Sequence, residues 1–81
     1  MASIEDRVKN LLTQKLMVEP NEVIPDAQLR EDLGEEDGDN GPLANFLSEE
    51  FGITCREDDV RNMDRVQDVI DFVKQRMTQT A

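Results

Sequence analysis

The chain has 81 residues, and its 19 Asp and Glu residues outnumber its 9 Lys and Arg residues, which gives a formal net charge of −10. This length suffices for one small domain, residues 1–81, and excludes a two-domain enzyme. Nucleic acids and anionic membrane surfaces would repel such a chain, whereas a protein with a basic patch would attract it.

The residue types that are missing exclude several chemistries. The sequence has no His, so an imidazole base or a His-containing metal site is impossible. Its single Cys, Cys55, cannot form an internal disulfide and is expected to be a small buried hydrophobic residue. The charged start, with Glu5, Asp6 and Arg7, is unlike a signal peptide, and no apolar run is long enough to span a membrane. We expect a cytoplasmic protein that is not an enzyme.

The first predicted element is an amphipathic helix over residues 3–16. Ser3 is its expected N-cap, and Asp6 occupies the position that completes a capping box. Its apolar residues recur at helical spacing, namely Ile4, Val8, Leu11, Leu12 and Leu16.

A long connection follows, in which Pro20 and Pro25 disfavour both helix and strand. Its apolar residues have no regular spacing: Val23, Ile24, Ala27, Leu29 and Leu33. We therefore predict a loop whose side chains fill part of the core.

The second helix is predicted over residues 42–51, after a segment rich in acidic residues and Gly. Pro42 suits the first helical position, with Asn40 or Gly41 as the cap, and Gly52 ends the helix. The residues expected to face inward are Leu43, Phe46, Leu47 and Phe51. A helix that starts this late leaves residues 35–41 with few apolar contacts, and we expect that segment to be mobile.

Two further helical segments complete the chain. Residues 57–61 are long enough for one short helical turn. The last helix is predicted to have Asp64 as its cap and Gln67 in a capping box, and Lys74 and Arg76 oppose the negative end of its dipole. Its apolar stripe consists of Val66, Val69, Ile70, Val73 and Met77. The pattern predicts an all-α four-helix bundle with a long first loop and a short third helix.

Over nearly its whole length the chain resembles the acyl carrier protein family. The resemblance is carried by the order and spacing of five segments, residues 4–9, 22–23, 29–34, 47–53 and 66–73. It implies the same four-helix bundle. Members of that family carry acyl chains on a 4′-phosphopantetheine arm, attached to the Ser of an Asp-Ser-Leu motif at the start of helix two. Basic patches on partner enzymes bind the acidic face of that helix.

The sequence differs from the family at the attachment position. Where the family has Ser and Leu, this chain has Asp37 and Gly38, so the hydroxyl that accepts the arm is missing. Asp37 has three interpretations: a lost attachment site, a charge that resembles a phosphorylated serine, or a loop residue beside a shifted alignment. Loss of the site is the simplest of these, and we expect no modification and no cofactor.

Four acidic residues are candidates for partner binding: Glu36, Asp39, Glu49 and Glu50. For an arbitrary helix such residues form a solvated face, and the resemblance makes a docking surface an equal alternative. The acidic run that begins at Asp37 does not have the ligand spacing of a calcium-binding loop, because Pro42 and Ser48 occupy the positions that need Gly and Glu.

Two functions remain open at this stage. The first is an acyl-carrier-protein-like, acidic, monomeric interaction module that binds proteins with basic patches, such as acyl-transfer or biosynthetic enzymes. The alternative is an acyl carrier protein that carries 4′-phosphopantetheine in fatty-acid, polyketide or specialised lipid synthesis.

Overall fold

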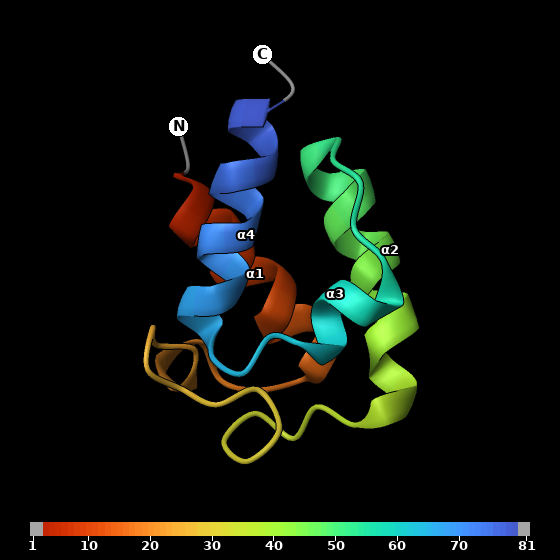
Figure 1. Cartoon of the computed structure of the whole chain (residues 1–81). Helices are drawn as coiled ribbons and strands as arrows, with labels where there is room; N and C mark the ends of the chain where they lie inside the picture. The colour runs from red at the N-terminus through yellow and green to blue at the C-terminus, as the bar shows by residue number, and fades with distance from the viewer. Residues whose placement is uncertain (1–2, 80–81) are drawn as a thin grey trace.

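The computed structural model describes residues 3–79 and contains four α-helices, α1 (Ile4–Leu16), α2 (Asn40–Phe51), α3 (Glu57–Arg61) and α4 (Val66–Gln79). The first connection also holds two 3₁₀ turns, η1 (Pro20–Glu22) and η2 (Asp37–Asp39). Among the described residues the only β-type pairing is a single bridge between Gln28 and Arg65. The predicted all-α bundle with a long first loop and a short third helix is confirmed (Figure 1).

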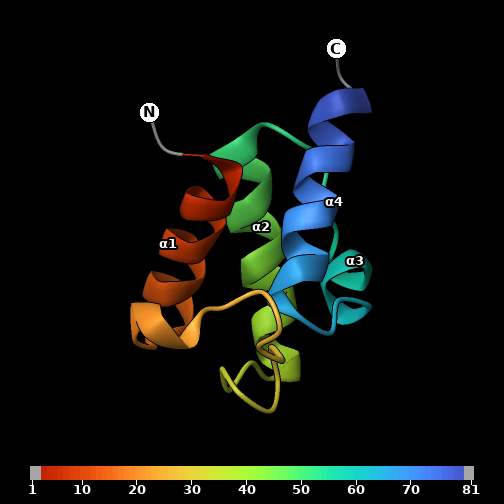
Figure 2. The same ribbon diagram turned by 90° about the vertical axis from the view of Figure 1, so that its left-hand side faces the viewer.

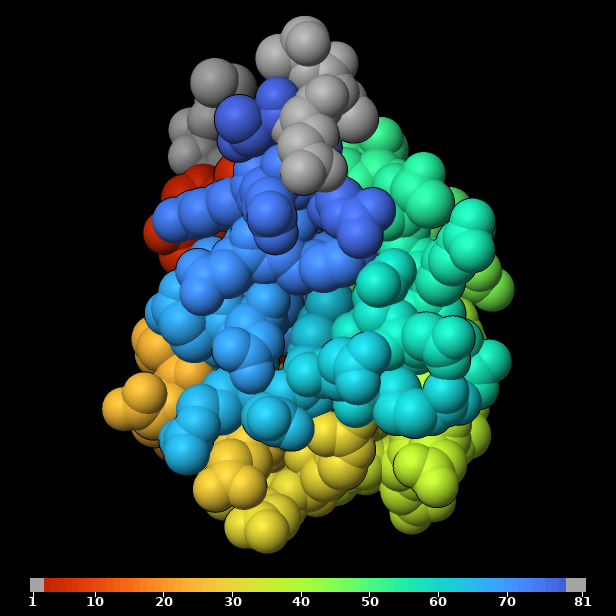
Figure 3. Space-filling model, viewed as in Figure 1, coloured from red at the N-terminus to blue at the C-terminus, as the bar shows by residue number. Residues whose placement is uncertain are grey.

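The helices pack in two pairs, α1 against α4 and α2 against α3. The long first loop lies across the end of the bundle where α1 ends and where α2 and α4 begin (Figures 1 and 2). Figure 3 shows the face on which α4 and α3 lie next to each other, with the first loop along its lower edge. Within residues 3–79 no helix is both long enough and apolar enough to cross a membrane.

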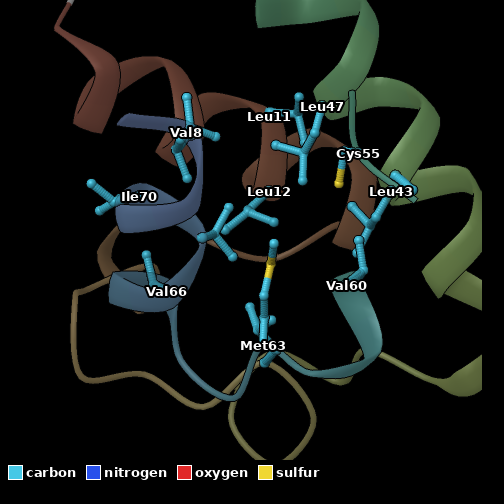
Figure 4. Close-up of a cluster of buried hydrophobic side chains, with 14 of the residues drawn as sticks. Val8, Leu11, Leu12, Leu43, Leu47, Cys55, Val60, Met63, Val66 and Ile70 are labelled. Carbon is cyan, nitrogen blue, oxygen red and sulfur yellow. The ribbon is translucent and has the colours of Figure 1, made fainter. Parts of the chain in front are cut away.

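Side chains from all four helices form one apolar core. Val8, Leu11 and Leu12 of α1 share this core with residues of α2, and Cys55 lies beside Leu43 and Leu47 (Figure 4). Cys55 is buried, as predicted, and burial is the main reason that the pKa of its thiol rises to about 11. The thiol is therefore neutral at physiological pH and contributes as an apolar group.

The predicted N-cap of α1 is confirmed, because the Ser3 Oγ accepts a hydrogen bond from the Asp6 backbone N–H at 3.1 Å. The helix ends at Met17, whose left-handed backbone (φ 55°, ψ 48°) directs its N–H to the Thr13 carbonyl. This terminal conformation is common in proteins, but Gly usually occupies it.

The first loop fills part of the core, as predicted, with Val23, Ala27, Leu29 and Leu33 all buried. The prediction was wrong for Ile24, whose residue is 52% exposed. Adjacent side chains outside a helix point in different directions, so burial of Val23 leaves Ile24 at the surface.

The start of α4 differs from the prediction that Asp64 and Gln67 cap it. The Asp68 carboxylate accepts hydrogen bonds from the backbone N–H groups of Asp64 at 2.9 Å and Arg65 at 3.0 Å. The first two N–H groups of the helix donate to the first loop, Val66 to the Ala27 carbonyl and Gln67 to the Pro25 carbonyl, both at 3.0 Å. The helix therefore begins after Arg65, because the loop and Asp68 supply its acceptors.

The predicted start of α2 was also wrong by two residues. The helix begins at Asn40, directly after η2, and Pro42 is its third residue. Pro fits there because the first four N–H groups of a helix have no partner within it, so the missing donor costs nothing. The predicted end is confirmed, because Gly52 adopts a left-handed conformation (φ 64°) after Phe51. Leu43, Leu47 and Phe51 are buried as predicted, whereas Phe46 is half-buried.

Candidate docking and attachment site

The predicted attachment position, Asp37, is the first residue of η2 and lies just before α2. Two bonds shape the turn: the Glu36 N–H donates to the Asp39 carboxylate, and the Asp39 N–H donates to the Glu36 carbonyl, both at 2.9 Å. The Asp37 side chain is exposed and makes no hydrogen bond or ion pair with the described residues. This turn therefore presents the Asp37 carboxylate to solvent just before α2, next to the exposed Glu36 side chain.

A second carboxylate, that of Glu35, lies just before this turn in the chain and is buried. Its side chain has 0% exposure, and neither of its oxygens accepts a hydrogen bond from the described residues. The Nε of Arg30 lies 3.6 Å from its Oε2. Burial raises the pKa of Glu35 above its usual value, and the charges of Asp39 and Asp37 add to this, while Arg30 opposes it. A carboxyl group in this environment binds a proton more readily than one in water.

Arg30 connects Glu35 to the end of α3. Its guanidinium donates to the Met63 carbonyl at 2.9 Å and to the Arg61 carbonyl at 2.7 Å. It also lies 3.7 Å from the exposed Asp64 carboxylate. One cation of the first loop therefore holds the segment before α2 and the segment after α3 together.

The far end of the turn buries another polar group. Asn40, the first residue of α2, has no exposed surface, and both polar atoms of its side-chain amide lack a partner among the described residues. The segment before α2 thus covers a buried polar side chain at each end.

The other two candidate docking residues lie at the opposite end of α2. Glu49 and Glu50 line a groove between α1 and α2. Glu50 is not free, because the Arg7 Nε donates to its Oε2 at 3.1 Å and the Arg7 guanidinium also lies over the Phe51 ring. Across the same groove the Lys15 ammonium is 3.9 Å from the centre of the Phe46 ring.

The candidate docking residues therefore form two separate pairs. Glu36 and Asp39 are joined by a hydrogen bond before α2, and Glu49 and Glu50 lie together near its end. Sequence reasoning missed Arg30, Glu35 and Asn40, and no local signal would have revealed them, since Glu35 lies in a run of acidic residues that suggests solvent exposure. Within residues 3–79 no cluster of three or more Asp, Glu or Cys side chains could hold a metal ion.

The structure is thus a compact helical bundle with an exposed turn just before its second helix. Proteins named acyl carrier protein are similar to this chain over 88–94% of its length. One from Thermosynechococcus vestitus is 33% identical over 76 residues, which cover 94% of this chain and 94% of that protein. One from Nitratidesulfovibrio vulgaris strain DP4 is 38% identical over 71 residues, covering 88% and 93%. One from Solidesulfovibrio magneticus is 34% identical over 74 residues, covering 91% and 95%.

These similarities establish that the chain belongs to the acyl carrier protein family. Members of this family are carrier proteins and not enzymes. No protein-family model matches the chain.

Proposed function

We propose that this protein is a member of the acyl carrier protein family that does not accept 4′-phosphopantetheine and acts as an acidic interaction module. The observation that carries the proposal is the absence of a hydroxyl where the arm would be attached. Asp37 occupies that position, and residues 14–47 contain no Ser or Thr. A carboxylate has no alcohol with which to form the phosphodiester.

Other hydroxyls of the described residues have structural roles that support this proposal. Ser3 caps α1. Ser48 donates to the Ala44 carbonyl at 2.8 Å and accepts from the Cys55 N–H at 3.1 Å, so it joins α2 to the turn that follows it. Ser48 lies inside α2, and Ser3, although exposed at the start of α1, is remote in sequence from the segment before α2 and uses its Oγ as the cap of α1.

The negative charge that binds a partner is carried mainly by Glu36, Asp37 and Glu49 in this proposal. These three carboxylates are exposed and make no ion pair with the described residues. Asp39 and Glu50 contribute less, because one accepts a backbone hydrogen bond and the other is paired with Arg7. The partners we propose are cytoplasmic acyl-transfer or biosynthetic enzymes with a basic patch, which bind the protein as a monomer.

Mass spectrometry after incubation with coenzyme A and a broad-specificity phosphopantetheinyl transferase tests the proposal. The unchanged chain should keep its mass. The Asp37→Ser variant should be modified poorly, because Gly38, the second residue of η2, lacks the apolar side chain that the family has there. The double variant Asp37→Ser with Gly38→Leu should be modified better, and it has room, because no atom lies within 4 Å of a Cβ added at Gly38. Modification of the unchanged chain would refute the proposal.

The second candidate, a working acyl carrier, is favoured by the names of the relatives. It requires that 4′-phosphopantetheine be attached to a residue other than a Ser at position 37. The intact mass of the protein isolated from its native host separates the two functions: a bare chain supports the interaction module, and an added arm supports the carrier.

A further inference from the structure

The segment that leads into α2 adjoins buried polar side-chain groups without hydrogen-bond partners, which lowers the stability of its folded arrangement. We call this arrangement the closed form. The first residue of the segment, Glu35, has a buried carboxylate that accepts no hydrogen bond from the described residues, and Asn40, which follows the segment as the first residue of α2, has a buried amide in the same situation. Buried polar groups without partners are rare in folded proteins, because each costs the free energy of its lost hydration. The lost hydration of these groups therefore lowers the stability of the closed arrangement.

Few interactions compensate for this cost. The Glu35 N–H donates to the Leu29 carbonyl at 2.9 Å, and the Glu35 carboxylate is attracted to Arg30 at 3.6 Å. Arg30 meanwhile donates to two carbonyl groups after α3, so its charge is shared. The residues between the two buried side chains, Glu36 to Asp39, bury no apolar side chain.

The segment is also free to move at its start. Gly34 has a left-handed backbone (φ 74°), and no atom lies within 4 Å of the position where its Cβ would be. A Gly in such a position can change its backbone angles with little steric cost. The segment therefore has a hinge directly before the buried carboxyl group.

We propose that residues 35–39 form a proton-linked flap, which lies closed while Glu35 is protonated and opens, bringing Glu35 into water, when that group is ionised. The charged groups that face Glu35 are Arg30 from the first loop and Asp37 and Asp39 from η2, and Asp64 from the connection between α3 and α4 faces Arg30. The flap carries Glu36 and Asp37. Proton binding therefore changes how these charges are presented, a consequence that matters for docking only if the proposed function is correct.

The direction of the pH effect follows from linkage. Burial holds the pKa of Glu35 in the closed form above 4.5, the ordinary value of a Glu carboxyl group, which the open form regains. Between these two pKa values the closed form binds one more proton, so the ratio of open to closed flap rises about tenfold for each pH unit. Below the lower pKa both forms are protonated, and above the higher one both are ionised, so the ratio is constant there.

Amide hydrogen exchange tests the flap without any partner or coenzyme A. The amides of Glu35, Glu36 and Asp39, which donate hydrogen bonds in the closed form, should lose protection, corrected for intrinsic exchange, as the pH rises from 4.5, and should then reach a plateau. The neutral isostere Glu35→Gln should remove this dependence. The matched control Glu31→Gln removes an exposed carboxylate of the same loop and should keep it.

Two readouts separate the flap from global unfolding and from loss of fold in a variant. Amides of α4 near Val69 should show no such pH dependence, and a parallel loss there would refute local opening. In the unmodified chain, an NMR titration of the Glu35 carboxyl carbon should give a pKa above 4.5. A pKa at or below that value, or equal pH dependence in Glu35→Gln, would overturn the proposal.

Discussion

Replacing Met17 with Gly should stabilise the protein, although it removes a large apolar side chain. Met17 ends α1 with φ 55° and ψ 48°, and the residue is 90% exposed, so its side chain contributes almost no packing. A left-handed conformation costs a residue other than Gly about 1–2 kcal/mol. Gly avoids that cost but loses more backbone entropy on folding, about 0.5–1 kcal/mol.

The difference between these two effects lies in the range of about 0–1.5 kcal/mol, and its midpoint predicts a net gain of about 0.75 kcal/mol in the free energy of unfolding for Met17→Gly. For a domain of this size that corresponds to a rise of roughly 3–6 °C in Tm. Urea titration and thermal melting followed by circular dichroism measure both quantities. Met17→Ala is the control, because it removes the same side chain and keeps the backbone strain, so its stability should change by less than about 0.5 kcal/mol. A Gly variant no more stable than the Ala variant would refute the reasoning.

Four other outcomes can be measured on the same material. Leu29→Ala should cost about 2–5 kcal/mol in urea titrations, because the residue has no exposed surface, and an equal cost for Ile24→Ala would contradict the assigned burial. Asp68→Ala should cost about 1 kcal/mol through loss of the α4 cap, and more than Asp64→Ala, whose carboxylate is exposed. Cys55 should react with a disulfide reagent at pH 8 only as fast as the fold opens, since its pKa is about 11, and rapid reaction of the native protein would contradict its burial. Because the net charge is −10, Tm should rise with NaCl as the Debye length falls to about 10 Å at 0.1 M, and more per ion with Mg²⁺, whereas a constant Tm would exclude repulsion as a destabilising effect.

The sequence by itself was sufficient to predict four helical segments and to indicate the family. The apolar spacing of α1 and α4, the Ser3 cap and the Gly52 stop all depend on residues within one or two turns of each other, and such local preferences act in any tertiary setting. The absence of a hydroxyl near position 37 is likewise a property of the chain alone. Burial of Leu29 was predictable because removing an apolar side chain from water is favourable wherever the chain allows it.

Only the tertiary structure decided where polar groups find partners. The start of α4 depends on carbonyl groups at Pro25 and Ala27, some forty residues earlier in the chain, so the local prediction of its cap was wrong. Arg7 pairs with Glu50 on another helix, which removes one charge from the predicted docking surface. Glu35 is buried and lies 3.6 Å from Arg30, whereas its neighbour Glu36 is exposed. Pairing and desolvation of charges depend on distances between segments remote in sequence, and no periodicity of the chain encodes those distances.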